Sequence, residues 1–146
     1  MSESGAKARF IEPMLLLRTE SLPEGADFSY ELKFDGYRAL AIKTGGKVCL
    51  RSRNDNDFNT RYPGIVKALA TMPDETVIDG EVVASMKTAS PPSTRLQNYR
   101  SASAPLHYII FDALILMGKE VMGEPLIKRR DLLEKPRPVV SIWKPR

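Results

Sequence analysis

Residues 31–38, with the sequence ELKFDGYR, combine a lysine with two acidic residues, a glycine and an arginine. Glu31 and Lys33 are two residues apart, so on a strand their side chains would share a face. A lysine amine attacks an electrophile only after it has lost its proton, and nearby cations lower its pKa. Gly36 would let a ligand approach the backbone closely. Lys33 is therefore a candidate nucleophile, although Asp35-Gly36 is also typical of a simple hairpin turn.

Other polar and aromatic residues could complete a site only if they share a face with this lysine. Asp79 and Glu81 lie two apart in the β-branched run TVIDGEVVA, which predicts that both point the same way. Arg51 and Arg53 alternate in LRSRN, where exposure to water is the default and phosphate binding is the alternative. Phe111 lies in LHYIIFDALILM, where packing in the core would be its ordinary role.

Hydrophobic periodicity predicts the elements that would hold these residues. Alternation and β-branched runs predict strands over residues 28–34, 37–43, 47–53, 76–84 and 106–117. Gly45-Gly46 predicts a turn between antiparallel strands. A short helix is expected from Pro63 to just before Pro73, and an amphipathic helix over residues 126–135. The fold class is therefore α+β, with twisted antiparallel sheets and few helices.

Composition sets further limits. The chain has 146 residues, of which 42% are hydrophobic and 27% charged, as in a single globular domain. The net charge of +4 suits a polyanionic partner without requiring one. The single Cys49 excludes an internal disulfide, and with the single His107 it predicts no metal cluster, so any metal would have oxygen ligands. The apolar run over residues 14–17 is too short for a signal peptide or a membrane span, which predicts a cytoplasmic location.

Four motifs in order, KFDGYR, SRN, DGE and YIIFDAL, resemble the motif set of ATP-dependent DNA ligases in the covalent nucleotidyltransferase superfamily. The similarity is greatest to the ligase module of bacterial double-strand-break repair. It implies a partial nucleotidyltransferase (ATP-grasp-like) adenylation domain over residues 12–135. A flexible lead-in is expected over residues 1–11 and an irregular tail over residues 136–146.

The resemblance implies a role for each matching residue. Lys33 would attack the α-phosphorus of ATP and form lysine-AMP, which passes AMP to the 5′-phosphate of nicked double-stranded DNA before the 3′-hydroxyl seals the nick. Magnesium is the expected metal, with Asp79 or Asp112 as candidate helpers. The implied ATP contacts are Glu31 and Phe111 on the adenine, Arg38 near the ribose and phosphates, Arg53 near the phosphates, and Glu81 on the ribose.

The chain also departs from the family pattern. It lacks an EGVV-like strand, a later lysine-bearing strand and the oligonucleotide-binding domain, so we expect weak ATP binding and little self-adenylylation by this chain alone. It would be a truncated product, a fragment or one half of a split enzyme whose partner supplies the rest. Asp55 stands where the family commonly has glycine, which a left-handed conformation would tolerate.

Two alternative functions remain open: a non-catalytic module that binds nucleotide or DNA, and an RNA ligase or capping-type relative. Residues 128–130, KRR, predict the exposed face of a helix, with contact to DNA phosphates as the alternative.

Overall fold

A computed structural model describes residues 5–15, 18, 20–21, 23–27, 36–84 and 106–134. The predicted strand over residues 28–34, which contains Glu31 and Lys33, lies outside these ranges. The connection at residues 85–105 and the predicted tail also lie outside them. Among the described residues, no helix is long and apolar enough to cross a membrane.

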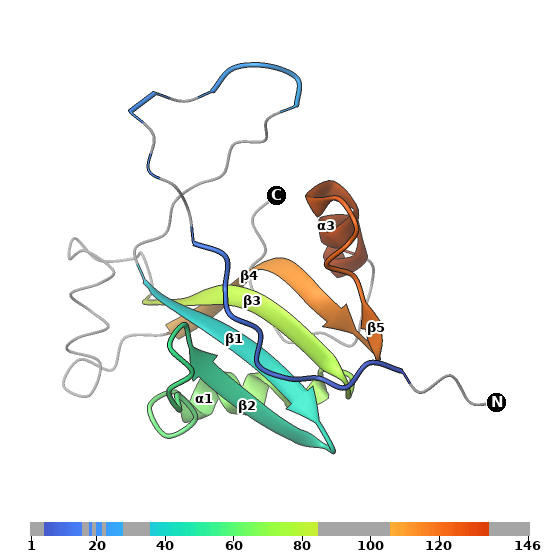
Figure 1. Ribbon diagram of the computed structural model, residues 1–146. Coiled ribbons are helices and arrows are strands. Elements are labelled where there is room, and N and C mark those ends of the chain that lie inside the picture. The colour runs from blue at the N-terminus through green and yellow to red at the C-terminus, as the bar shows by residue number, and fades with distance from the viewer. Residues whose placement is uncertain are drawn as a thin grey trace.

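Five antiparallel strands form one sheet in the order β2-β1-β3-β4-β5 (Figure 1). Their bounds are β1 (Tyr37–Thr44), β2 (Lys47–Ser52), β3 (Thr76–Ala84), β4 (Leu106–Leu116) and β5 (Lys119–Glu120). The first four coincide closely with predicted strands, and the α+β prediction is confirmed. The sequence analysis missed β5 because so short a segment carries no periodicity.

Left-handed residues form the turns on either side of β2. Gly45 and Gly46 have φ angles of 56° and 75°, which suit glycine and match the twist of a two-residue antiparallel turn, as predicted. Asp55 also adopts a left-handed φ, 61°, so the expected tolerance of aspartate is confirmed. Its carboxylate accepts a hydrogen bond of 2.8 Å from Nε of Arg51, which ties the turn to the strand.

The loop after β2 covers the outer edge of that strand. The side-chain amide of Asn59 accepts a hydrogen bond from the N–H of Leu50 at 2.6 Å and donates one to the carbonyl of Val48 at 2.9 Å. The N–H of Phe58 donates to the carbonyl of Leu50 at 2.9 Å. These backbone groups would otherwise be free to pair with another strand.

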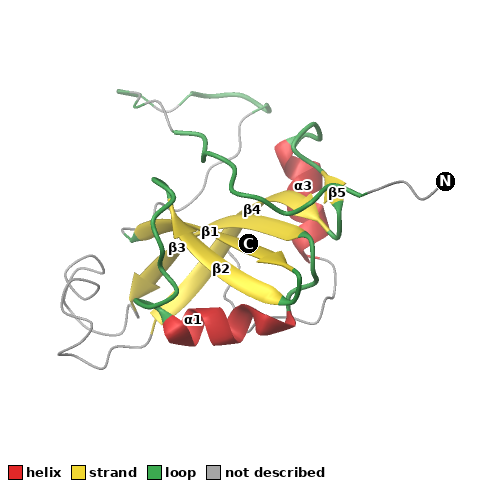
Figure 2. Cartoon of the chain, turned by 60° about the horizontal axis from the view of Figure 1, so that its bottom comes forward, coloured by secondary structure: helices red, strands yellow, loops and turns green. Residues whose placement is uncertain are grey.

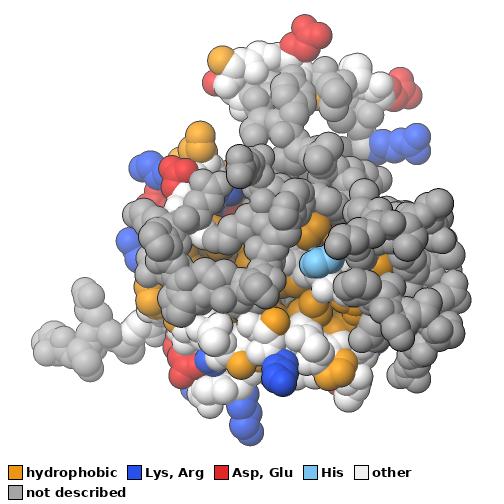
Figure 3. Space-filling model, turned by 180° about the vertical axis from the view of Figure 1, so that it is seen from behind, with side chains coloured by type: hydrophobic (Ala, Val, Ile, Leu, Met, Phe, Trp, Pro, Cys, Tyr) orange, Lys and Arg blue, Asp and Glu red, His pale blue; other side chains and the backbone are white. Residues whose placement is uncertain are grey.

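The larger hydrophobic core lies between the sheet and helix α1 (Pro63–Ala68), which continues into the 3-10 turn η1 (Leu69–Thr71) (Figure 2). The helix predicted to begin at Pro63 and end before Pro73 is confirmed. Seen from behind, apolar side chains occupy the centre of the visible described surface, and Lys and Arg side chains lie towards its margin (Figure 3). Among the described side chains visible on this side, Lys and Arg are therefore not gathered in a stripe.

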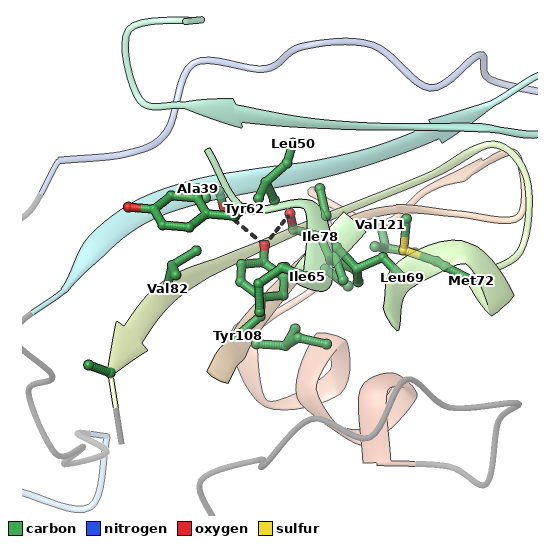
Figure 4. Close-up of a cluster of buried hydrophobic side chains, with 14 residues drawn as sticks. Ala39, Leu50, Tyr62, Ile65, Leu69, Met72, Ile78, Val82, Tyr108 and Val121 are labelled. Carbon is green, nitrogen blue, oxygen red and sulfur yellow. Dashed lines mark hydrogen bonds between the residues drawn. The ribbon is translucent and has the colours of Figure 1, made fainter. Parts of the chain in front are cut away.

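The side chain of Tyr108 lies inside this core and extends from β4 towards β1 (Figure 4). Its buried hydroxyl donates a hydrogen bond of 2.7 Å to the carbonyl of Ala39, and burial raises the pKa of Tyr108 well above its ordinary value. The ring lies against Gly80, where an added Cβ would stand 2.9 Å from Cζ of Tyr108 and would collide with the carbonyl oxygen of Ile109. Close packing against Tyr108 and Ile109 therefore explains why the DGE motif has glycine at position 80.

The N-terminal segment, defined here as residues 5–15, lies on the face of the sheet opposite α1 (Figure 2). Ala8 is buried there beside Leu40. The N–H of Ala8 donates to Oε2 of Glu75 at 2.5 Å, and Oε1 of Glu75 accepts from the hydroxyl of Thr44 at 2.6 Å. Where the sequence analysis expected a flexible lead-in over residues 1–11, the described part of it packs on the sheet. Ala6, Ala8 and Phe10 pack there and alternate with Lys7 and Arg9. This alternation is too short to predict a strand, and the sequence analysis did not use it.

Helix α3 (Leu126–Glu134) packs against β4 at the position predicted for a helix. Its apolar residues do not form the single stripe that was predicted. Leu132 and Leu133 pack on the core, whereas Ile127 is 72% exposed. Residues five and six apart lie on different sides of a helix, so these leucines cannot bury Ile127 with them.

The basic run in α3 is divided between water and the sheet. The side chain of Lys128 is 67% exposed. That of Arg129 is only 14% exposed and is bonded to Asp112 of β4, while Nε of Arg130 donates to the carbonyl of Phe111 at 3.2 Å. The predicted exposed basic face is therefore wrong for both arginines, because helical geometry turns them towards β4.

Candidate functional site

Neighbouring strands bring three of the candidate residues onto one face. The β1–β3 register pairs Arg38 with Glu81 and Leu40 with Asp79. Directly paired residues of adjacent strands point to the same face. Arg38, Asp79 and Glu81 therefore share the face opposite α1, and the prediction that the two acidic residues point the same way is confirmed.

Arg38 and Asp79 form a bidentate ion pair on this face. Nε of Arg38 lies 3.0 Å from Oδ1 of Asp79, and Nη2 lies 2.6 Å from Oδ2. Burial raises the pKa of Asp79, and the hydrogen bonds from Arg38 act in the opposite direction. The same hydrogen bonds raise the pKa of Arg38. Nη1 of Arg38 donates to the carbonyl of Met14 at 2.9 Å, so the guanidinium also touches the N-terminal segment.

Phe111 occupies a β-bulge in β4. The β3–β4 register pairs Asp79 with Asp112, passes over Phe111 and resumes at Ile110. A bulge redirects the side chain of the extra residue. The ring of Phe111 faces Arg38, whose Cζ lies 5.2 Å from the ring centroid, and it belongs to neither hydrophobic cluster of the described residues. Phe111 is thus aimed at the polar face and not at the core.

Glu81 and Arg53 differ in how closely they join this group. Glu81 is half-buried on the central strand β3. Arg53 is exposed in the turn after β2, and no contact between described residues links it to Arg38 or Phe111. Since Ser52 pairs with Ala39, Arg53 nevertheless lies at the same end of the sheet as Arg38.

Lys33 and Glu31 lie outside the described residues, which resume at Gly36, three positions after Lys33 in the sequence. A Cβ added to Gly36 would collide with the carbonyl oxygen of Val82 and stand 2.7 Å from Cγ1 of Val83. A larger residue would push this end of β1 away from β3. The glycine of the lysine motif is therefore required where the two strands approach closely.

The two candidate metal helpers are already bound to arginines. Asp79 is held by Arg38, and Asp112 is held by Arg129 through contacts of 2.7 Å and 3.0 Å. In the described ranges, no group of three His, Cys, Asp or Glu residues could hold a metal ion. The surroundings of Asp79 and Asp112 therefore do not fit a magnesium site.

Residues 13–139 match the sequence profile of the ATP dependent DNA ligase domain. The chain belongs to the ATP-dependent DNA ligase family. The ligase family implied by the four motifs is thereby confirmed, and likeness to solved ligase domains confirms the nucleotidyltransferase fold.

Similar ligases are much longer than this chain. DNA ligase C1 of Mycolicibacterium smegmatis is 34% identical over 139 residues, which cover 84% of this chain and 40% of that protein. The multifunctional non-homologous end joining protein LigD of Pseudomonas aeruginosa is 33% identical over 138 residues, covering 90% of this chain and 16% of LigD. A solved structure of mycobacterial DNA ligase D complexed with ATP and MES has a TM-score of 0.66 at 33% identity, covering 80% of this chain and 38% of that one. The chain thus spans well under half the length of these ligases.

Two features of this group of residues were not foreseen from the sequence. The pairing of Arg38 with Asp79 could not be predicted, because another strand lies between theirs in the sequence and only the strand order β2-β1-β3 makes the two strands neighbours. The bulge at Phe111 has no signal, because LHYIIFDALILM is apolar on nearly every position and does not reveal its phase.

Proposed function

We propose that this chain binds ATP on the face formed by Arg38, Glu81 and Phe111 and supplies the nucleophilic lysine of a DNA ligase. One observation carries the proposal. Residues from three strands, far apart in the sequence, meet on one face in a member of the ATP-dependent DNA ligase family. That a related ligase has been solved complexed with ATP supports ATP as the nucleotide.

The residue types suit the parts of ATP that we assign to them. A partly exposed aromatic ring such as Phe111 can stack on a base, a contact worth about 1–3 kcal/mol. The guanidinium of Arg38 donates to ribose and phosphate oxygens, and the carboxylate of Glu81 accepts from ribose hydroxyls. Arg53 would add a second cation near the phosphates, and Glu31 would contact the adenine.

The proposed reaction begins at Lys33. Its neutral amine attacks the α-phosphorus, a P–N bond forms, the bond to pyrophosphate breaks and the amine proton passes to solvent. AMP then moves to the 5′-phosphate of nicked double-stranded DNA, and the 3′-hydroxyl displaces it. Such steps depend on alignment and charge neutralisation, which fixed cations provide. In this proposal magnesium is only the ion that accompanies the triphosphate of ATP. The cytoplasmic location remains a prediction from the sequence.

The test is the transfer of label from ATP labelled at its α-phosphate, in the presence of magnesium. Label on Lys33 should survive denaturation and alkali and be released by acid, as expected of a phosphoramidate. Lys33→Ala should lose the label, whereas Lys47→Ala, which changes an exposed lysine of β2, should keep it. The assay is run on this chain alone, where we expect weak labelling, and with the remaining part of a related ligase domain added.

Absence of any Lys33-dependent label under both conditions would overturn the catalytic proposal and favour a non-catalytic nucleotide- or DNA-binding module. If label forms, sealing of nicked DNA compared with nicked RNA tests the substrate. Preferential sealing of RNA would contradict a DNA ligase.

A further inference from the structure

The bulge that carries Phe111 is held by two consecutive arginines of α3. Arg129 binds both carboxylate oxygens of Asp112, the next residue along β4, at 2.7 Å and 3.0 Å. Nε of Arg130 donates to the carbonyl of Phe111 itself at 3.2 Å. One helix therefore contacts two adjacent residues of the bulge.

The guanidinium of Arg129 is also tied to the loop that precedes its helix. Its Nη1 donates to the carbonyl of Glu124 at 2.8 Å and to that of Met122 at 3.3 Å. The side chains of Arg129 and Asp112 are only 14% and 15% exposed. A planar guanidinium with this many partners fixes the orientation of the carboxylate, which a lysine ammonium could not reproduce.

Phe111 needs such support because the strand ladder does not provide it. The register skips Phe111, so its backbone is not aligned by cross-strand pairing as its neighbours are. A binding side chain that must hold one angle depends on the residues that lock its backbone and neighbours. On the other side, Arg38 lies over the ring and is itself fixed by Asp79.

We propose that Arg129 is a positioning residue for the nucleotide site: through Asp112 it fixes the bulge in β4 and thereby the angle at which the ring of Phe111 meets the adenine. The adenine contact rests on the proposed function, whereas the hold on the bulge does not. A rival explanation is that Arg129 merely attaches α3 to the sheet.

A double-mutant cycle on ATP binding separates the two explanations. Titration calorimetry gives the Kd for ATP of the wild type, Arg129→Gln, Phe111→Ala and the double variant. We expect Phe111→Ala to weaken binding about tenfold and Arg129→Gln about fivefold, with the double variant no weaker than about tenfold, because both act through one ring. Losses that multiply in the double variant would overturn the proposal.

Matched variants of the same helix control for loss of stability. Leu132→Ala removes packing against the core but leaves the Arg129–Asp112 pair in place, so it should lower the Tm and leave the Kd for ATP unchanged. Lys128→Gln should change neither. Arg129→Lys should recover only part of the affinity. A Kd for Leu132→Ala as weak as that for Arg129→Gln would contradict a positioning role.

Hydrogen exchange tests the hold on the bulge without nucleotide. The amides of Asp112 and Ala113 should exchange about tenfold faster in Arg129→Gln and in Asp112→Asn, and at the wild-type rate in Lys128→Gln. Unchanged exchange rates in Arg129→Gln would overturn the proposal, whatever the Kd of that variant for ATP. Faster exchange combined with normal ATP binding by Phe111→Ala would instead show that the proposed adenine contact is wrong.

Discussion

Two arginine–aspartate pairs flank the aromatic ring of Phe111, and each joins elements that are distant in the sequence. Arg38 reaches across 41 positions to Asp79, and Arg129 across 17 to Asp112. Burying such charges costs solvation, and a partner left alone would keep that cost without the attraction. Single substitutions in either pair should therefore lower the free energy of unfolding more than substitutions of exposed charged residues do.

Asp79→Asn should lower the free energy of unfolding by about 3 kcal/mol, because it leaves the half-buried guanidinium of Arg38 against a neutral group. Urea denaturation measures the change. Asp131→Asn, at an exposed position of α3, is the control and should shift stability by less than about 0.5 kcal/mol. Equal effects of the two variants would show that the Arg38–Asp79 pair contributes nothing specific.

Gly80→Ala should destabilise the fold by about 2 kcal/mol or more, because the new methyl group collides with the Ile109 carbonyl and the ring of Tyr108. Gly64→Ala is the matched control, since nothing lies within 4 Å of its added Cβ and it is in α1. That variant should gain about 0.5–1 kcal/mol from helix propensity. Thermal unfolding of both variants measures these changes in stability. An unchanged stability of Gly80→Ala would contradict the close approach of Gly80 to Ile109 and Tyr108.

At the scale of elements, the strands and the first helix could be predicted because their hydrophobic patterns and turn residues agree. Gly45-Gly46 fixes the first hairpin, and Pro63 marks the start of α1. The bulge at Phe111 could not be predicted, since one extra residue in a fully apolar strand leaves the pattern unchanged. The direction of Arg129 was missed because helical spacing gives the faces of a helix but not which face meets the sheet.

The attachment of the N-terminal segment should depend on pH through Glu75. Hydrogen bonds from the hydroxyl of Thr44 and the N–H of Ala8 lower the pKa of Glu75 below its ordinary 4.5. The charged form is thus favoured in the folded state. Its contribution to stability is complete above the unfolded-state pKa and is lost as the pH falls through the lower folded-state value.

Glu75→Gln should therefore lower the Tm most near about pH 7, and the difference from the wild type should shrink towards about pH 3. Glu124→Gln, which changes an exposed glutamate, is the control and should give a small difference throughout. A Glu75→Gln difference that is constant across this range would mean that the carboxylate does not hold Ala8.

At the scale of the whole molecule, one sheet separates two different environments. The face towards α1 is hydrophobic core, whereas the opposite face carries the N-terminal segment and the polar group around Arg38. The sequence could not predict this division fully, because β1 is buried on both faces and its apolar run does not distinguish them. Arg38 and Leu40 are two residues apart and so share a face, but only the packing of Ala39 and Ala41 on the α1 side shows that this face is turned away from α1.

Strand order predicts the pattern of hydrogen exchange. Amides of β1 and β3, which are paired on both sides, should exchange most slowly, and those of the two-residue edge strand β5 most quickly. Exchange followed by NMR or mass spectrometry measures this ranking. Equal protection of Ile78 and Lys119 would contradict a stable centre flanked by weaker edges.

Asn59 imitates the backbone of a neighbouring strand, presenting one acceptor to Leu50 and one donor to Val48. Concentrated protein should therefore resist fibre formation and edge-to-edge polymerisation through β2, because an incoming chain would have to displace an intramolecular amide first. Colloidal behaviour during expression and storage would thus depend in large part on a side chain that belongs to no proposed nucleotide contact.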